Sequence, residues 1–384
     1  MIRIDKTIVA LAITATFATW SGTAQAAGET VIKIGHVAPM TGNIAHFGKD
    51  NENGAKMAIE DLNAKGWIIG GAKARFELIS EDDAADPKQG TAAAQKLVDA
   101  KVNGVIGHLN SGTSIPASKI YFEAGIPQIS PSSTATKYTL QKFNTAFRVV
   151  ANDNQLGGTL GRYAVNTLKG KNIAVIDDRT AYGQGVADEF LKSAKAAGAQ
   201  IVTREYTTNQ ATDFAAILTN IKSKKPDIVF YGGMDAQAGP LLNQMKQLGL
   251  AAKVMGGDGM CTTELPKLAS GGMIDNQVVC AEAGGVTKEF QKGWDDFRAR
   301  YKKKFNADVN LYAPYVYDAT MVMAEAMKKA NSADPKKYLP VLAKISTKGV
   351  SGPISFDANG DVKGGTLTLY TYKGGNRESL GVVK

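Results

Sequence analysis

Short apolar runs alternate with amphipathic stretches along the first third of the chain. The strand-like runs cover residues 31–37, 75–80 and 102–106, and the helical patterns between them cover residues 53–64 and 88–100. One face of the first helical pattern is apolar, at Ala55, Ala58, Ile59 and Leu62. Its period is therefore that of a helix, and Gly66 after it is a typical stop signal. The alternation predicts βαβ units, in which helices cover both faces of a parallel sheet.

The same alternation restarts after residue 150. Strand-like runs cover residues 172–176, 200–206, 227–231 and 253–255, and helical patterns cover residues 185–197, 214–223 and 241–248. Asp86 and Asp213 each open a helix that leads into an apolar strand ending in glycine, which suggests two related lobes. Any two βαβ units share such spacing, so this similarity is weak evidence by itself. The tail predicts helices at 287–305, 317–330 and 335–345 and a final pair of strands around 357–361.

The first 26 residues have the pattern of a secretory signal peptide. Arg3 and Lys6 precede an apolar run, and Ala24 and Ala26 supply the small residues of a cleavage site. We expect cleavage after Ala26, with an uncleaved anchor as the alternative. No later apolar run is long enough for a membrane helix. Removing 26 of 384 residues leaves 358, which is more than one core usually serves, so we expect two lobes.

The chain is basic, with a formal net charge of +9 at pH 7, or +8 without the leader. The basic residues are scattered over predicted helix faces with few aromatic residues between them, and no nucleic-acid-binding motif occurs. We therefore expect a solvated basic surface and no nucleic-acid partner. Adhesion to an anionic membrane face is an alternative without support.

Cys261 and Cys280 are the only cysteines. In an exported chain the oxidising compartment favours a disulfide between them, and two buried thiols are the alternative. The three histidines and two cysteines form no cluster at the spacing of metal ligands, so we expect neither a metal nor another cofactor.

Four loops that follow predicted strands carry the candidate chemistry. They cover residues 38–48, 107–114, 130–136 and 256–261. In open α/β sheets ligands bind beyond the carboxyl ends of the strands, so these loops should line one pocket in the cleft between the lobes. Ser111, Ser132 and Thr134 lie close to predicted helix starts, where hydroxyls and free backbone N–H groups can hold a carboxylate.

Asp258 completes a clamp for a zwitterion. It lies among glycines in the sequence Gly256-Gly257-Asp258-Gly259, and an ammonium needs an anionic partner where water is excluded. An ordinary turn aspartate is the alternative for Asp258, and plain helix caps are the alternative for Ser111 and Ser132. Spacing alone favours these alternatives.

Several motifs in order form a specific pattern. They are Asp86-Pro87-Lys88-Gln89, Gly107-His108-Leu109, Tyr182-Gly183-Gln184-Gly185 and Phe230-Tyr231-Gly232-Gly233. Through them, nearly the whole chain after the leader resembles the extracytoplasmic branched-chain amino-acid-binding proteins of ABC importers. The resemblance implies the α/β fold of type I periplasmic binding proteins, with two doubly wound parallel-sheet lobes joined by a three-stranded hinge. It further implies a periplasmic monomer that delivers an amino acid to the membrane permease subunits of an ABC transporter.

The resemblance also implies where the lobes begin and end. The N-terminal lobe would comprise residues 27–150 plus 282–366, and the C-terminal lobe residues 151–281 plus 367–384. The chain would then cross between the lobes near Ala151, Ala283 and Thr366.

Roles in the pocket follow from the same resemblance. Residues matching Ser111, Ser132 and Thr134 surround the carboxylate and amine of the ligand. The residue matching Asp258 pairs with the amine, and the one matching Tyr182 closes the site from the second lobe. The other expected wall residues are Phe47, Leu109, Asn110, Met234 and Tyr312. Ordinary core packing is the alternative for the aromatic residues among them.

The chain departs from the familiar members of this family at several pocket positions. They have Glu at the position of Asp258, Ala at Ser132, Tyr at Phe47, an aromatic residue at Met234, and a bridge between the positions of Ala85 and Asn110. A shorter acid and a different apolar wall shift the preference among amino acids. Leucine, isoleucine or valine is thus a first prediction. A sensory or regulatory protein of the same fold, for another small amino acid or an amide, is the alternative.

A secreted serine hydrolase, with Ser111 as nucleophile and His108 as base, is the remaining alternative. The chain has no glycine two residues before Ser111, and His108 lies on the same short loop without an orienting acid. We therefore expect no enzyme, and we interpret His108 as a strand-end histidine whose hydrogen bonds are satisfied.

Overall fold

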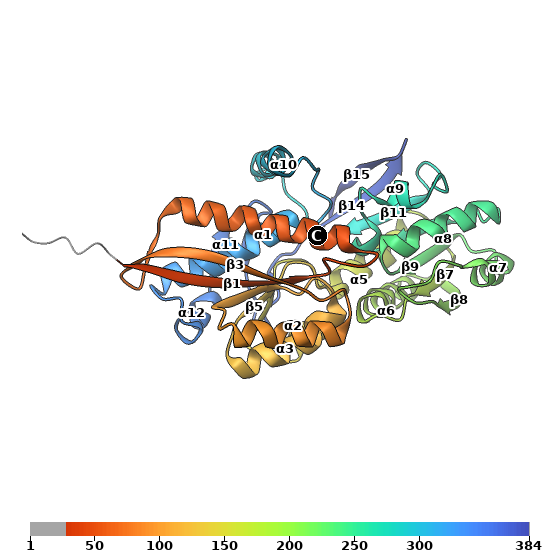
Figure 1. Cartoon of the computed structure of the whole chain (residues 1–384). Helices are drawn as coiled ribbons and strands as arrows, with labels where there is room; N and C mark the ends of the chain where they lie inside the picture. The colour runs from red at the N-terminus through yellow and green to blue at the C-terminus, as the bar shows by residue number, and fades with distance from the viewer. Residues whose placement is uncertain (1–27, 384) are drawn as a thin grey trace, which may run out of the picture.

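The computed structural model describes residues 28–383 (Figure 1). The predicted signal peptide, residues 1–26, lies outside the described residues. No helix in residues 28–383 is both long enough and apolar enough to cross a membrane. The strands of this range form two large sheets and one short two-stranded ribbon.

The first large sheet has six strands in the order β2-β3-β1-β4-β5-β6. Its strands are β1 (Glu29–Ala38), β2 (Ile68–Ile69), β3 (Ala72–Asp82), β4 (Gly104–Gly107), β5 (Gln128–Ser130) and β6 (Ala146–Arg148). Every neighbouring pair is parallel except β2 and β3. The strand order reverses at β1, which has β3 on one side and β4 on the other, so the loops after these strands border a crevice.

The second large sheet has seven strands in the order β15-β14-β11-β10-β9-β7-β8. They are β7 (Asn172–Asp177), β8 (Gln200–Tyr206), β9 (Ile228–Gly232), β10 (Lys253–Gly256), β11 (Val278–Glu282), β14 (Leu367–Lys373) and β15 (Asn376–Val383). Strands β7 to β11 pair in parallel, whereas β14 and β15 add an antiparallel edge. The short ribbon pairs β12 (Ser346–Lys348) with β13 (Pro353–Ser355).

Helices cover both faces of each sheet. On the first sheet, one face carries α1 (Ala45–Lys65), α11 (Ala313–Lys329) and α12 (Pro335–Leu342), and the other carries α2 (Pro87–Asp99) and α3 (Ser111–Ala124) (Figure 1). On the second sheet, α5 (Asp153–Asn166) and α6 (Ala181–Ala196) cover one face, and α7 (Ala215–Ser223) and α8 (Asp235–Gln247) cover the other. The remaining helices are α4 (Lys137–Leu140), α9 (Leu265–Leu268) and α10 (Gln291–Phe305). Two doubly wound sheets confirm the predicted fold class.

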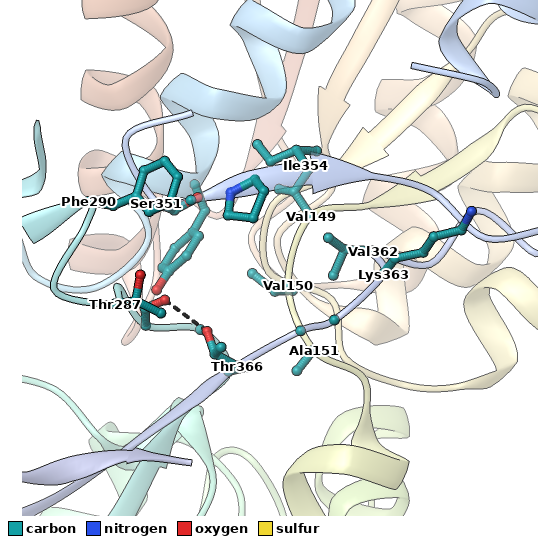
Figure 2. Close-up of a pocket in the computed structure, with 18 residues that line it drawn as sticks. Val149, Val150, Ala151, Thr287, Phe290, Ser351, Ile354, Val362, Lys363 and Thr366 are labelled. Atoms are coloured by element: carbon teal, nitrogen blue, oxygen red, sulfur yellow. Dashed lines mark hydrogen bonds between the residues drawn. The ribbon is translucent and has the colours of Figure 1, made fainter. Parts of the chain in front are cut away.

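The chain passes three times between the two sheets, as the resemblance implies. The passages lie between β6 and α5, between β11 and α10, and between β13 and β14. They are joined to one another, because Ala151 N donates to Ala283 O at 2.9 Å and Thr366 Oγ1 donates to Gly285 O at 2.8 Å. Figure 2 shows the cavity of about 110 Å³ beside these passages. The two sheets are therefore tethered at one side and meet across a cleft on the other.

Several boundaries differ from those expected. Two helices begin earlier than predicted: the one predicted at 53–64 begins at Ala45, and the one predicted at 317–330 begins at Ala313. The helix predicted at 287–305 begins later, at Gln291. The pair of strands expected around 357–361 is wrong. Those residues form a turn closed by a bridge between Phe356 and Val362, and the final pair of strands is β14 and β15.

Helix α5 was not expected, because its sequence contains three glycines, which lower helix propensity. The structure gives these glycines a packing role. A Cβ atom on Gly157 would lie 2.6 Å from Val186 O, and one on Gly161 would lie 2.6 Å from Phe190 O. Glycine thus lets the backbones of α5 and α6 approach closely, which outweighs its local propensity.

Candidate functional site

Seven of the predicted site residues line one small space between the two sheets. They are Leu109, Asn110, Ser111, Ser132, Tyr182, Met234 and Tyr312. The space has a volume of about 10 Å³, and a larger chamber of about 360 Å³ shares Asn110, Tyr182 and Met234 with it. Six of the seven follow β4, β5, β7 or β9, so the site lies beyond the carboxyl ends of parallel strands from both sheets.

The other three predicted residues, Phe47, Thr134 and Asp258, are fully buried. Phe47 lies in the first turn of α1, and its ring centroid is 5.8 Å from that of Tyr312. It therefore supports the wall of the space from behind. Asp258 and Thr134 each occupy a distinct polar position.

Asp258 is held by two tyrosines, one from each side of the cleft. Its Oδ1 accepts a hydrogen bond from the Tyr182 hydroxyl at 2.7 Å, and its Oδ2 accepts one from the Tyr312 hydroxyl at 2.8 Å. Tyr182 belongs to α6, against the second sheet, whereas Tyr312 precedes α11, against the first. Burial raises the pKa of Asp258 to about 6, while the two hydrogen bonds act in the opposite direction. The carboxyl is therefore mostly ionised at neutral pH.

Asp50 positions Tyr312. Its buried carboxylate accepts hydrogen bonds from the backbone N–H groups of four consecutive residues, Asn310, Leu311, Tyr312 and Ala313. These groups include the start of α11, where the helix dipole favours an anion. Burial raises the pKa of Asp50, and the four N–H groups oppose that shift. Asp50 was not predicted from the sequence, because its partners lie about 260 positions away.

The loops after β4 and β5 are fastened to each other by hydroxyl groups. Ser132 Oγ donates to Leu109 O at 2.9 Å, and Ala135 N donates to Ser111 Oγ at 3.2 Å. Helix α3 begins at Ser111. Within residues 28–383 the side chain of the preceding Asn110 makes no capping hydrogen bond to this helix. The first backbone N–H groups of α3 lack intrahelical partners, so this end of the space has the positive potential of a helix start.

Thr134 and Asp153 form a second polar position close to Asp258. Among the described residues, Thr134 Oγ1 and both carboxyl oxygens of Asp153 have no hydrogen-bond partner, although all three are buried. Burial raises the pKa of Asp153 to about 8, with nearby Thr134 acting against the shift and the charge of Asp258 adding to it. Asp153 was not predicted from the sequence, because the helix that it begins, α5, was not predicted either.

The predicted disulfide between Cys261 and Cys280 is present, with Cα atoms 5.4 Å apart. Cys261 follows the short 3-10 turn Asp258–Met260, and Cys280 lies in β11. The alternative of two buried thiols is therefore wrong. The bond ties the segment that carries Asp258 to the second sheet.

His108 has both ring nitrogens engaged away from the site. Nδ1 lies 3.1 Å from Asp83 Oδ2, and Nε2 lies 3.0 Å from the Tyr121 hydroxyl. This confirms the interpretation of His108 as a histidine whose hydrogen bonds are satisfied. The expectation that no acid orients His108 is wrong, because Asp83 does so from a loop 25 positions earlier. The geometry gives no support to His108 as a base for Ser111, whose hydroxyl instead accepts from Ala135 N.

Comparison with known proteins identifies relatives that match almost the whole chain. The model of the family described as periplasmic binding protein matches residues 31–376. A leucine-, isoleucine-, valine-, threonine- and alanine-binding protein of Pseudomonas aeruginosa is 34% identical over 374 residues, which cover 96% of each chain.

Two solved structures are similar over nearly their whole length. The leucine-binding protein LivK of Thermotoga maritima has a TM-score of 0.83 and 26% identity, over 92% of this chain and 98% of its own. The substrate-binding protein LivJ of Streptococcus pneumoniae, solved in complex with isoleucine, has a TM-score of 0.83 and 28% identity, over 92% of this chain and 99% of its own.

Proposed function

Because the chain belongs to the periplasmic binding protein family, we propose that it captures an amino acid between its lobes and delivers it to the permease of an ABC importer. A branched-chain amino acid, leucine, isoleucine or valine, is the proposed ligand. The names of the similar proteins support this choice, since they bind leucine or isoleucine.

The single observation that carries the proposal is the position of Asp258. A fully buried carboxylate lies at the cleft, bonded to one tyrosine from each side of it. An ionised acid in such a place is costly unless a cation joins it, and the ammonium group of an amino acid is such a cation. Two tyrosine hydroxyls leave further lone pairs of the carboxylate available for the ammonium.

The opposite charge of the ligand has its own partner. The α-carboxylate would accept from the first backbone N–H groups of α3 and from the hydroxyl of Ser111, which accepts from Ala135 N and keeps its own proton free. Ser132 would become a second donor once its hydroxyl turns from Leu109 O to the ligand. Thr134, with an unpaired buried hydroxyl among the described residues, would bind the amine together with Asp258. Leu109, Asn110, Met234 and Phe47, with the rings of Tyr182 and Tyr312, would surround the side chain of the ligand.

We assign the lobes to residues 27–150 plus 282–366 and to residues 151–281 plus 367–384, with hinges near Ala151, Ala283 and Thr366. The space of about 10 Å³ is lined by residues from both sides of the cleft, and it shares Asn110, Tyr182 and Met234 with the chamber of about 360 Å³, which has room for the side chain of an amino acid. The ligand would therefore enter while the lobes are apart, and contacts from both lobes would then stabilise the closed form.

The proposal involves no bond-making or bond-breaking, and the protein acts as a periplasmic monomer after cleavage behind Ala26. Its relatives are binding proteins rather than enzymes. The permease subunits of the importer are the proposed protein partner.

Calorimetry with leucine on the variant Asp258→Ala tests the proposal. We expect a loss of about 2–5 kcal/mol in binding free energy, because the variant leaves a buried ammonium without its anion. Tyr338→Phe is a control, since it removes a buried tyrosine hydroxyl of α12 that donates to Asn103 O, outside the site. Wild-type affinity in Asp258→Ala would refute the role of Asp258, and a panel of all common amino acids without binding would refute the function.

A further inference from the structure

His46 and Asp235 meet across the cleft between the two sheets. His46 Nε2 lies 2.9 Å from Asp235 Oδ2. His46 is the second residue of α1, which packs on the first sheet, and Asp235 is the first residue of α8, which packs on the second. Figure 1 shows the start of α1 beside the start of α8. The two residues are 189 positions apart and belong to different lobes. The contact therefore exists only while the lobes are together.

Asp235 is fixed in place on its own side of the cleft. Its side chain is fully buried, and its Oδ2 also accepts a hydrogen bond from Thr262 Oγ1 at 2.6 Å. Its position in the first turn of α8 stabilises its negative charge through the helix dipole. The histidine therefore meets a preformed anion.

The charged groups that act most strongly on His46 are acidic, and Lys49, one turn later on α1, is exposed to solvent. The acidic groups are Asp235 from α8, Glu264 from the segment before α9, and Asp50 from α1 itself. Burial lowers the pKa of His46, but the hydrogen bond and charge of Asp235, together with the other two carboxylates, outweigh burial. The net pKa in the closed form is raised above the usual value of 6.5.

The contact lies next to the candidate site. Met234, which precedes Asp235, lines the small space, and Phe47, which follows His46, packs against Tyr312. A separation of the lobes that admits a ligand must therefore also separate His46 from Asp235. This step rests on the proposed function, because it takes closure around a ligand as given.

We propose that His46 and Asp235 form a pH-sensitive latch that holds the lobes closed and tightens ligand binding in mildly acidic solution. In the open form His46 loses Asp235, and its pKa returns toward 6.5. Closure therefore takes up a proton at pH values between 6.5 and the raised pKa of the closed form. The latch is at full strength below pH 6.5, and it loses its ionic part as pH rises through the raised value.

The test compares the affinity for leucine of the wild type and of His46→Gln across about pH 6 to pH 8.5. We expect the wild type to bind about threefold to tenfold more tightly at pH 6, as for a partly buried ion pair, and about equally at pH 8.5. Asp153 and Asp258 are present in both proteins, so their titration cancels in the ratio. When both proteins also carry Asp235→Asn, the ratio of their affinities should no longer depend on pH.

A neutral contact across the cleft provides the control. Asn43 Nδ2 donates to Asn209 O at 3.1 Å, so Asn43→Ala should weaken binding by the same factor at both pH values. If the ratio of the leucine affinities of the wild type and His46→Gln does not change with pH, the latch is overturned, even though leucine binds.

Small-angle scattering of the ligand-free proteins tests the latch independently of the ligand. The wild type should be more compact at pH 6 than at pH 8.5, and His46→Gln should show no such change. Equal compactness of the two proteins at both pH values contradicts the latch. If instead the difference appears but no amino acid binds, the latch stands and the proposed function fails.

Discussion

Buried carboxyl groups decide most of what happens at single residues in this cleft. Asp258 has two tyrosine partners and Asp50 has four backbone N–H partners, whereas the oxygens of Asp153 have none among residues 28–383. The first two therefore recover much of the cost of burial through hydrogen bonds, and Asp153 does not. A side chain in this condition lowers the stability of the protein without ligand, which is typical of residues kept for function.

Asp153→Asn should stabilise the ligand-free protein. Because the pKa of Asp153 is raised to about 8, the folded protein holds this proton more tightly than the unfolded chain. Stability is then lost as pH rises from about 4 to about 8, and the variant, which cannot ionise, avoids this loss. We expect the free energy of unfolding to rise by about 1–3 kcal/mol at pH 8 and by less at pH 4 in urea titrations. An equal gain at both pH values would contradict the assignment.

Among the structural elements, the segment after β10 is the one that a covalent bond secures. It carries Asp258, Cys261 and Thr262, and thus reaches both the candidate site and the latch. The disulfide joins it to β11 in the middle of the second sheet, 19 residues away. This short segment would otherwise depend on a 3-10 turn alone, and such turns are weaker than α-helices.

Replacing both cysteines, Cys261→Ser with Cys280→Ser, should lower the free energy of unfolding by about 2–4 kcal/mol, because the unfolded chain is no longer restrained. We also expect weaker leucine binding, since the segment that carries Asp258 is less firmly held. Urea unfolding and calorimetry measure the two effects. The variant Ser270→Ala, on the exposed turn before β11, is a control for surface changes. Unchanged stability in the double variant would show that the bond has no such role.

On the scale of the whole molecule, two lobes, each built on one large sheet, share one tether and one cleft. The three passages are hydrogen-bonded to one another on one side, while Tyr312 with Asp258 and His46 with Asp235 join the lobes on the other. These two contacts across the cleft are polar. Such contacts can be exchanged with water when the lobes open, so closure is reversible.

Leucine should raise the melting temperature, because it binds only the folded protein. At a concentration a hundred times the Kd, mass action adds about 2.7 kcal/mol, which corresponds to a shift of about 3–4 °C for a chain of this length. Differential scanning fluorimetry with each common amino acid measures the shift and ranks the ligands. D-leucine is a suitable control, because its reversed stereocentre cannot place both charged groups on the same partners. Equal shifts with both enantiomers would argue against the proposed clamp.

Much of the architecture is readable from local sequence. The apolar periods predict the parallel strands and most helices, and Asp86 caps α2 by accepting from the N–H groups of Lys88 and Gln89 at 2.9 Å. Seven of the ten predicted ligand-binding residues line one space, because loops after parallel strands meet at the same edge of a sheet. Most of their individual roles followed from the resemblance, since spacing alone favours turns and caps.

The sequence by itself determined most of the order of elements, though not α5 or the final pair of strands, together with the fold class and the cysteine pair, because periodicity, turn residues and composition act over a few neighbouring positions. Only the tertiary structure decided the glycine-rich contact of α5 with α6, the two tyrosines on Asp258, the cradle of Asp50 and the meeting of His46 with Asp235. The hydrogen-bonded partners of Asp258, Asp50 and His46 lie 54 to 263 positions away from them in the sequence. The energy of such a contact depends on which groups burial brings together and which it deprives of water, and no local pattern along the chain records that.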